Sequence, residues 1–392
     1  MQKILVINAG SSTIKWKLFE KDNLEVIAEG VADRINVDGQ IITKFNGKKT
    51  EREVNLPTHT EAAVEIIKDL ETHKIIEDLS TIKFVGNRVV QGGDVFPKST
   101  IINDKELKQI SDLGVLAPLH NPGAVLAIEA FKKILPDAQY SATFDTSFHT
   151  TIPAINNTYP MNQELAKKHK IKRYGAHGTS HRYITLELEK ILDKKNVTFV
   201  SMHIGNGASL CAVKESKSFD TSMGLTPLAG IMMGTRSGDI DPSIHKYVVE
   251  QEGITVQEFD RILNKESGLK GVSGISQDMR DVTEAALKGN KQAEFAMDLY
   301  AQKVADYVAT YYNKLGAKID ALVFTAGVGE NSSIIRGKII DKLHFAKIKL
   351  DKSKNEAKFD DVNLITTDDS EVKVYIIRTD EELLIAKDAV NL

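Results

Sequence analysis

The sequence contains a single cysteine and no long apolar run. Cys211 lies within an apolar, strand-like stretch, so an intramolecular disulfide is excluded and we expect a reducing compartment. That setting favours a small core residue over a reactive nucleophile. We find no run of about 18 apolar residues, so we predict no membrane-spanning helix.

An excess of charge of either sign is also missing. The 51 basic and 54 acidic side chains leave a formal net charge of −3, which gives no electrostatic reason to expect nucleic acid or an anionic membrane as a partner. The first residues are typical of a strand rather than of a signal peptide, so we expect a cytoplasmic location. The 392 residues are enough for two or three globular domains.

The familiar nucleotide-binding motifs are absent from the sequence. We find neither the G-x-x-x-x-G-K-[ST] loop nor the glycine loop and H-R-D set of protein kinases. Instead, an apolar run at residues 4–7 ends in a turn of small residues at 8–12, and an alternating strand that carries Lys15 follows. The backbone N–H groups, hydroxyls and lysine of this segment suit a phosphate, although an ordinary hairpin turn has the same composition.

The pattern of a strand followed by a glycine turn occurs twice more. Residues 199–204 lead into a turn at 205–209 and a second strand, and residues 321–324 lead into a turn at 325–331 and a helix. Two of the three turns open hairpins about half a chain apart. We therefore predict two related α/β halves, each bringing a phosphate-binding hairpin to a shared cleft.

Periodicity and capping patterns predict the other elements. We expect strands at residues 25–32, 40–45, 48–54, 82–85, 139–144 and 372–377. We expect helices after the capping residues 58–61, at 123–133, up to about residue 192, at 291–316 and after 379–382. Residues 224–241 form a long glycine-rich loop, and a loop of that length inside a domain is more often functional than not.

Two arginines, Arg88 and Arg236, stand in glycine-rich segments that we interpret as loops. An arginine in such a loop can reach a bound anion, and its planar fork suits a carboxylate or a phosphate. The competing interpretation is a structural arginine that pairs with a surface acid.

The other candidate residues also have structural alternatives. Asp145 follows a predicted strand, where open α/β sheets place their sites, but an aspartate there can also form a local turn. His177 lies between two glycines and His203 precedes a glycine turn, so each is a candidate for contacting a charged group, while single histidines are as often structural. Glu381 lies in the first turn of a predicted helix, where the dipole favours an acid and where Mg²⁺ is an alternative reason for one.

Several of these segments resemble one known family. Residues 6–15, VINAGSSTIK, closely resemble the N-terminal signature of acetate kinases, and residues 86–93, GNRVVQGG, resemble their second signature. Further similar segments follow in the family's order at residues 116–122, 144–149, 173–181, 203–207, 233–239, 324–331 and 378–386. The resemblance covers nearly the whole chain, and the combination of motifs is highly specific.

The resemblance implies an α/β fold of the actin-like ATPase superfamily, with two duplicated ribonuclease H-like domains and an active-site cleft between them. The expected domains are residues 1–146, completed by a C-terminal helix at 383–392, and residues 147–382. The implied reaction is reversible transfer of a phosphoryl group from ATP to acetate, giving ADP and acetyl phosphate. Mg²⁺, or Mn²⁺ in its place, is the implied metal, and a homodimer is the implied assembly.

The family's motifs also imply roles for individual residues. Asn8 and Glu381 would bind the metal, and Arg88 the carboxylate of the substrate. Asp145 would be catalytic, and His177 and Arg236 would stabilise the transition state. The residues implied to contact the substrate's methyl group are Val90, Leu119 and Pro227. The residues implied to bind the nucleotide are Lys15, His203, Ile204, Gly205, Asn206, Gly207, Asp278, Met279, Arg280, Gly327, Val328, Gly329, Glu330 and Asn331. For Asp278, Met279 and Arg280 a solvated helix start remains the alternative.

Physical chemistry supports most of these roles. In-line phosphoryl transfer needs positioning and charge neutralisation, so Arg88, Arg236, His177 and Mg²⁺ would offset the repulsion between two anionic substrates. Asp145 is harder to explain as a base, because a carboxylic acid with a pKa near ~4 has already lost its proton at neutral pH. We therefore hypothesise that Asp145 orients an arginine or a metal-bound water.

The chain departs from the family pattern at three positions. Asn87 and Gln91 replace two histidines of the second signature, and Ala176 replaces a phenylalanine that would line the pocket for the substrate's methyl group. An alanine there would leave a larger pocket and favour propionate. One buried CH₂ group contributes only about 0.8 kcal/mol, so the selectivity should be modest.

Three alternatives to an acetate kinase stay open at this point. A propionate or butyrate kinase would share the fold and mechanism. A nucleotide-switched binding or scaffold protein would bind ATP without producing an acyl phosphate. A sugar kinase is disfavoured, because Arg88 and Arg236 suit an anionic acceptor better than a neutral hydroxyl.

Overall fold

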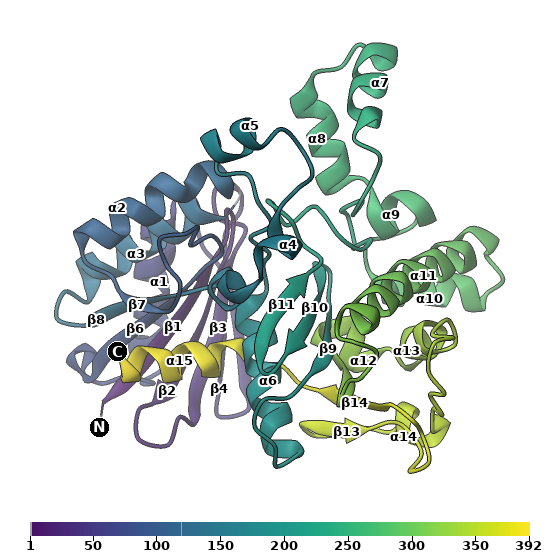
Figure 1. Ribbon diagram of the computed structural model, residues 1–392. Coiled ribbons are helices and arrows are strands. Elements are labelled where there is room, and N and C mark those ends of the chain that lie inside the picture. The colour runs from purple at the N-terminus through teal and green to yellow at the C-terminus, as the bar shows by residue number, and fades with distance from the viewer. Residues whose placement is uncertain (1, 119) are drawn as a thin grey trace. The chain divides into compact units, whose positions relative to one another are not determined.

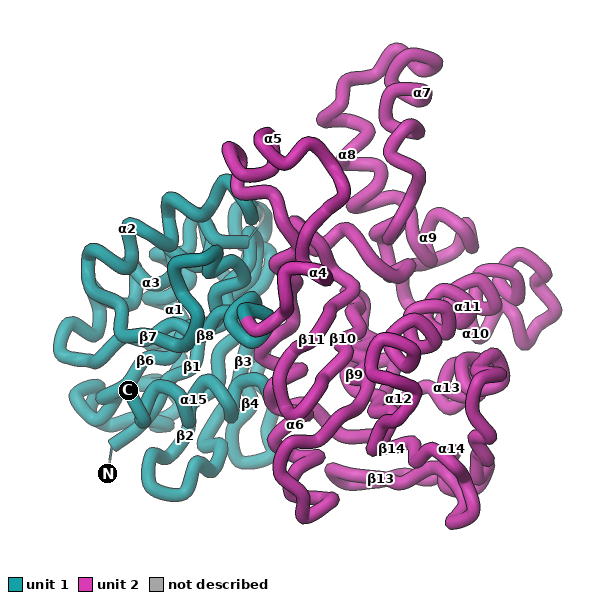
Figure 2. Tube along the Cα trace, in the orientation of Figure 1, with its two compact units in different colours: residues 1–150, 380–392 teal, residues 151–379 magenta. Residues whose placement is uncertain are grey.

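Each of the two units of the chain is built on its own mixed β-sheet. The structure, a computed structural model, describes residues 2–118 and 120–392. Unit 1 comprises Met1–Thr150 and Asp380–Leu392, and unit 2 comprises Thr151–Thr379 (Figure 2). Residues 147–150 and 380–382 thus group with unit 1, so the last helix and Glu381 belong to the same unit as the first strand.

Unit 1 contains an eight-stranded sheet in the order β5-β4-β3-β2-β1-β6-β8-β7 (Figure 1). Its strands are β1 (Lys3–Ala9), β2 (Ile14–Glu20), β3 (Val26–Asp33), β4 (Gln40–Phe45), β5 (Lys48–Glu53), β6 (Ile82–Val89), β7 (Thr100–Ile101) and β8 (Gln139–Phe144). Its helices are α1 (His59–Thr72), α2 (Asp104–Asp112), α3 (Asn121–Ile134) and α15 (Glu381–Asn391). Short 3-10 helices span Leu79–Thr81 and Leu113–Leu116, and a third, Ser147–Thr151, crosses the boundary between the units.

Unit 2 contains a six-stranded sheet in the order β11-β10-β9-β12-β14-β13. Its strands are β9 (Phe199–Ile204), β10 (Ala208–Lys214), β11 (Lys217–Thr221), β12 (Ala321–Thr325), β13 (Val362–Leu364) and β14 (Lys373–Ile377). Its helices are α4 (Ala154–Asn157), α5 (Gln163–Lys168), α6 (Gly178–Ile191), α7 (Ser243–Glu252), α8 (Val256–Lys265), α9 (Gly268–Ser273), α10 (Met279–Leu287), α11 (Lys291–Lys314), α12 (Ala326–Asn331), α13 (Ser333–Ile340) and α14 (Lys352–Glu356).

The two sheets repeat the same topology. In unit 1 the antiparallel strands β3, β2 and β1 are followed across the sheet by β6 and β8, both parallel to β1. In unit 2 the antiparallel strands β11, β10 and β9 are followed by β12 and β14, both parallel to β9. The predicted pair of related α/β halves is therefore confirmed. Three parallel strands in each unit end at the same edge, where open α/β sheets place their sites.

Strand β1 is buried on both faces, as its continuous apolar run predicts. Ile4 and Val6 pack with Ile385, Ala386 and Ala389 of α15 on one face. Leu5 and Ile7 point to the other face, into the core beneath α1 and α3, because side chains alternate along a strand. Figure 1 shows α15, in yellow, passing in front of the strands of this sheet near the labels of β1 and β2. The C-terminal helix thereby completes the unit that the N-terminal hairpin begins.

Strand β6 is longer than the sequence predicts, and this corrects the interpretation of Arg88 as a loop residue. The strand spans Ile82–Val89 and includes Arg88. Gly86, which suggested a turn, lies within the strand because α15 passes over it: a Cβ atom there would lie 2.8 Å from Cγ2 of Ile385. The glycine therefore marks a close helix contact rather than the end of a strand.

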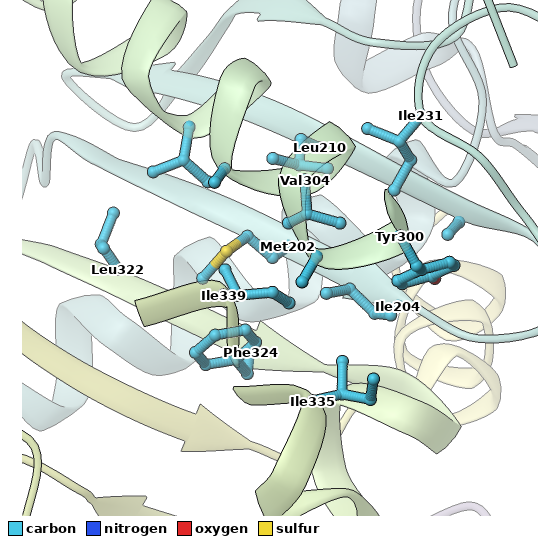
Figure 3. Close-up of a cluster of buried hydrophobic side chains, with 14 of the residues drawn as sticks. Met202, Ile204, Leu210, Ile231, Tyr300, Val304, Leu322, Phe324, Ile335 and Ile339 are labelled. Carbon is cyan, nitrogen blue, oxygen red and sulfur yellow. The ribbon is translucent and has the colours of Figure 1, made fainter. Parts of the chain in front are cut away.

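The core of unit 2 lies between its sheet and the long helix α11. Figure 3 shows Met202, Leu210 and Phe324 from the sheet in one cluster with Tyr300 and Val304 from α11. The predicted helix at residues 291–316 is thus confirmed, and it ends before Gly316, whose φ of +80° suits glycine. Within the part of the chain that the structure describes, no helix is long and apolar enough to cross a membrane.

Candidate active site

Three strand ends of unit 1 bring Asn8, Arg88 and Asp145 together. Asn8 lies near the end of β1, Arg88 near the end of β6, and Asp145 directly after β8. Arg88 Nε donates to Asp145 Oδ1 at 3.0 Å, and Nη2 donates to Oδ2 at 2.6 Å. Nη1 reaches Asn8 Oδ1 at 3.4 Å. The guanidinium is thus held in a bidentate pair with a carboxylate that is only 1% exposed.

Glu381 approaches this pair from the first turn of α15. Its Oε2 lies 3.8 Å from Arg88 Nε, and this buried oxygen accepts no hydrogen bond from any described residue. Burial raises the pKa of Glu381 to about 7, although Arg88 opposes the rise. Burial alone would lower the pKa of Arg88, but the Asp145 and Glu381 carboxylates raise it above its ordinary value. Lys17 holds the same turn of α15 through Asp380 and Glu382, at 3.6 and 3.7 Å.

The donor set of this cluster fits a Mg²⁺ ion. Asn8, Asp145 and Glu381 supply amide and carboxylate oxygens, and the orphaned Oε2 of Glu381 gains a partner when a cation is present. Mg²⁺ usually takes one or two carboxylates and completes its shell with water and phosphate oxygens. The described residues contain no group of three or more His, Cys, Asp or Glu that could hold a metal ion. This cluster has two carboxylates and one amide, so water and phosphate oxygens would have to supply the other ligands. Lys15 lies directly opposite Asn8 across the β1–β2 hairpin, with an exposed side chain.

In unit 2, two histidines stack beside the glycine turn that follows β9. The rings of His177 and His203 lie 4.2 Å apart. His177 Nδ1 lies 2.9 Å from Ser209 Oγ, and His203 Nδ1 lies 2.8 Å from Ser180 Oγ. His177 adopts a left-handed backbone conformation, with φ of 56°, at the start of α6. Hydroxyl partners and this strained backbone therefore fix where the His177 ring points.

Arg236 lies next to His177 with no acid to balance its charge. Its Nη1 donates to the Pro227 carbonyl at 3.3 Å, and no carboxylate of the described residues forms an ion pair with it. Burial lowers the pKa of Arg236. A Cβ atom on Gly207 would lie 3.4 Å from Arg236 Nη1 and 3.7 Å from His177 Nε2, so both side chains converge on the glycine turn. N–H donors of this kind, gathered at a glycine turn, suit an anion.

A cavity of about 820 Å³ lies entirely within unit 2, next to that turn. Its size falls in the range of small-molecule sites. Three predicted segments contribute to its wall: the turn after β9, the start of α10 and the start of α12. The predicted residues that line it are Gly205, Asn206, Asp278, Met279, Arg280, Gly327, Val328 and Asn331. Asp278 is also the N-cap of α10, so its structural alternative holds as well.

Other predicted nucleotide residues have different surroundings. Ile204 is fully buried in the core of unit 2 (Figure 3), and Gly329 is buried inside α12. The carboxylate of Glu330 forms hydrogen bonds to the protein backbone. Its Oε1 accepts from the N–H groups of Ala326 at 2.8 Å and Thr379 at 3.1 Å. The side chain of Glu330 thus organises the turn at the start of α12.

The residues predicted for the substrate pocket are only partly placed. Val90 is half-buried after β6, and Pro227 contributes its carbonyl to Arg236. Leu119 lies outside the described residues. Ala176 is 2% exposed and belongs to the core of unit 2, so its small side chain is packed against protein.

The two residues that replace histidines in the second signature have structural partners in this chain. Asn87 Nδ2 donates to the Ser141 carbonyl at 3.0 Å. Gln91 Oε1 accepts from the Gly93 N–H at 2.8 Å. Both amides therefore bond to the backbone around Arg88 and fix the end of β6.

Several lining residues were not singled out from the sequence. They are Gly234, Leu269, Gln277, Thr283, Glu284, Leu287, Tyr300, Ser332, Ser333 and Ile334. Most belong to helix faces, which look like ordinary amphipathic positions in the sequence. Two local signals were present: Gly234 lies in the predicted loop at residues 224–241, and the pair Ser332-Ser333 directly follows a predicted segment.

These features define a class of protein: a duplicated α/β fold with cationic groups and carboxylates at the strand ends. The chain matches the model of the acetokinase family over residues 3–387. It is 54% identical over 390 residues to an acetate kinase of Mycoplasmopsis pulmonis, covering 100% of this chain and 99% of that protein. It is 47% identical over 393 residues to an acetate kinase of Mycoplasmoides gallisepticum, covering 100% of both.

Solved structures agree with this relationship. The acetate kinase of Porphyromonas gingivalis has a TM-score of 0.94 at 37% identity, with 100% of this chain and 99% of that chain covered. A propionate kinase of Francisella tularensis has a TM-score of 0.94 at 40% identity, with 100% of both chains covered. The chain belongs to the acetokinase family. The family predicted from the sequence is thereby confirmed.

The raised pKa of Glu381 predicts a pH-dependent loss of stability in the metal-free protein. The unfolded chain releases this proton near pH 4.5, while the folded chain keeps it to about pH 7. The folded state thus binds more protons between these values, and its free energy of unfolding falls as the pH rises through them. Urea denaturation in EDTA should show this fall between pH 5 and pH 7.5 in the wild type and a flatter profile in Glu381→Gln. Glu382→Gln removes a neighbouring acid that contributes a smaller part of the rise in the Glu381 pKa, so it should keep most of the wild-type slope. Equal slopes in the wild type and Glu381→Gln would contradict the assignment.

Proposed function

We propose that this chain catalyses the reversible, Mg²⁺-dependent transfer of the γ-phosphoryl group of ATP to acetate, giving ADP and acetyl phosphate. The observation that carries the proposal is the surroundings of Arg236. Its half-buried guanidinium has no counter-ion among the described residues, and it lies beside His177 and a glycine turn at the wall of a cavity of about 820 Å³. A charge left unbalanced in this way favours a multiply charged anion as the ligand. The family supplies that anion, because its members named here are kinases.

In this proposal unit 2 binds the nucleotide. The cavity takes the nucleoside, and the turn at residues 205–207 faces the phosphates. Arg236 and His177 stabilise the charge that spreads over the transferring phosphoryl group, which is the main contribution a protein makes to this reaction. Their positions are set before the ligand arrives, by Pro227 for Arg236 and by Ser209 for His177.

Unit 1 binds the acceptor. Nε and Nη2 of Arg88 already donate to Asp145. The Nη1 side of the guanidinium therefore binds the carboxylate of acetate. Asp145 thus orients Arg88, which is one of the two roles that the sequence analysis hypothesised. Mg²⁺, when bound by Asn8, Asp145 and Glu381, would neutralise phosphate charge at this edge of the sheet.

A propionate kinase is the second candidate function. The solved propionate kinase of Francisella tularensis is as similar in fold as the acetate kinase. Ala176 is the residue of this chain that favours propionate, but its side chain is packed in the core of unit 2. We therefore keep acetate as the preferred acceptor. We also propose the homodimer and the cytoplasmic location that the family resemblance implies, and light scattering of the purified chain tests the first.

Trapping the product with hydroxylamine tests the reaction. With Mg-ATP, the wild type should form acetyl hydroxamate from acetate faster than the corresponding products from propionate or butyrate. Arg88→Ala should lose about 100-fold or more in kcat/KM, because it removes a charged hydrogen-bond donor worth about 3 kcal/mol. Arg88→Lys keeps a charge opposite Asp145 and shows whether a loss reflects misfolding. A faster reaction with propionate would show that propionate, not acetate, is the preferred acceptor. If the chain binds ATP but no product is trapped with any acid, a nucleotide-switched binding protein would be favoured.

The role of Asp145 can be separated from that of a base. Asp145→Asn keeps a side-chain oxygen as an acceptor for Arg88 but removes the charge, so we expect a higher KM for acetate and a kcat lower by about 10- to 100-fold. The pH profile of kcat/KM should keep its shape, since no proton leaves the acceptor. Loss of the acidic limb of that profile, at an unchanged KM for acetate, would show that Asp145 acts as a base.

A further inference from the structure

We propose that His59 is a positioning residue for the turn at residues 8–12 of unit 1, called here the phosphate turn; this inference rests on the proposed function. His59 is the first residue of α1 and is 4% exposed. Its Nε2 lies 2.7 Å from the carbonyl oxygen of Gly10. A carbonyl can only accept, so Nε2 carries a proton and donates it. The first residue of α1 thus forms a hydrogen bond to the middle of the phosphate turn, although the two residues are 49 positions apart in the sequence.

A second helix confines the same peptide group. Gly123 in the first turn of α3 packs directly on Gly10: a Cβ atom there would lie 2.5 Å from the Gly10 carbonyl oxygen and 2.9 Å from its carbon. The neighbouring peptides are also fixed, since Gly10 N–H donates to the Thr13 carbonyl at 2.8 Å and Ile35 N–H donates to the Ser12 carbonyl at 3.0 Å. The carbonyl of Gly10 therefore has one direction available to it, toward His59.

Fixing that carbonyl also fixes the next N–H group. A peptide bond is planar and trans, so the N–H of Ser11 points away from the side to which the Gly10 carbonyl points. Ser11 is exposed, and no described residue accepts a hydrogen bond from its N–H. The hydrogen bond from His59 thus directs a free backbone N–H group outward from the turn that begins with Asn8. Such a donor suits a phosphate oxygen.

The imidazole is not needed to start α1. Thr58 is the N-cap of this helix, and its hydroxyl accepts from the Thr60 N–H at 3.0 Å. Thr58 therefore offers a matched control: Thr58→Ala weakens the start of the same helix without touching the Gly10 carbonyl. His59→Gln supplies an amide N–H in place of Nε2 and tests rescue, while His59→Ala removes the donor.

The experiment compares steady-state kinetics and thermal unfolding of these variants. His59→Ala should lower kcat about 10- to 100-fold and raise the KM for Mg-ATP, with the KM for acetate changed less than about twofold. His59→Gln should recover most of kcat, and Thr58→Ala should lose thermal stability at wild-type kcat. Equal kcat losses in Thr58→Ala and His59→Ala, or wild-type kinetics in His59→Ala, would overturn the proposal.

Amide hydrogen exchange separates this inference from the proposed function. If the wild type forms no acyl phosphate, the proposed function fails, but exchange at residues 10–13 still reports on His59. It should be faster in His59→Ala and unchanged in Thr58→Ala. Unchanged exchange in His59→Ala would show that the turn does not depend on the imidazole.

Discussion

The buried pair of Arg88 and Asp145 is the interaction on which the candidate site of unit 1 depends. It forms only because β6 and β8 are adjacent and parallel, so that their carboxyl ends present the two side chains to each other. Removing one member of such a pair leaves a buried charge without a partner, at a cost of about 3–5 kcal/mol. The order of the strands therefore decides the chemistry at this edge, and α15 adds Glu381 to it by packing on β1 and β6.

Each unit contains a buried charged group that its protein neighbours satisfy only in part. In unit 2 burial lowers the pKa of Arg236, and no described carboxylate forms an ion pair with it. In unit 1 burial raises the pKa of Glu381 despite the nearby Arg88, and one of its oxygens accepts no hydrogen bond from any described residue. The charged form of each group is penalised until a ligand of opposite sign arrives, an anion for Arg236 and a cation for Glu381. Each unit is thus prepared for a ligand of its own kind of charge, an anion in unit 2 and a cation in unit 1.

Local sequence patterns predicted the parts of the fold and site that depend on neighbours along the chain. The strand and glycine-turn segments, the position of Asp145 after a strand and the start of α15 are of this kind. The prediction that Arg88 lies in a loop was wrong because Gly86 was interpreted as a turn residue. Gly86 is instead required by the close contact with Ile385, which lies near the other end of the chain. Tyr300 and His59 could not be assigned, since a helical tyrosine and a histidine in a first turn have ordinary structural interpretations until the tertiary contacts are known.

The geometry of Asp145 favours an electrostatic mechanism over proton transfer. Both of its carboxylate oxygens accept hydrogen bonds from Arg88, so taking a proton would weaken the pair that holds the guanidinium in place. Acetate has no proton to give at neutral pH, since carboxylic acids ionise near pH ~4. The reaction instead brings two anions together, and its barrier depends on how well their repulsion is offset. A carboxylate that fixes an arginine serves that need, because it sets the direction of the guanidinium before the acceptor binds.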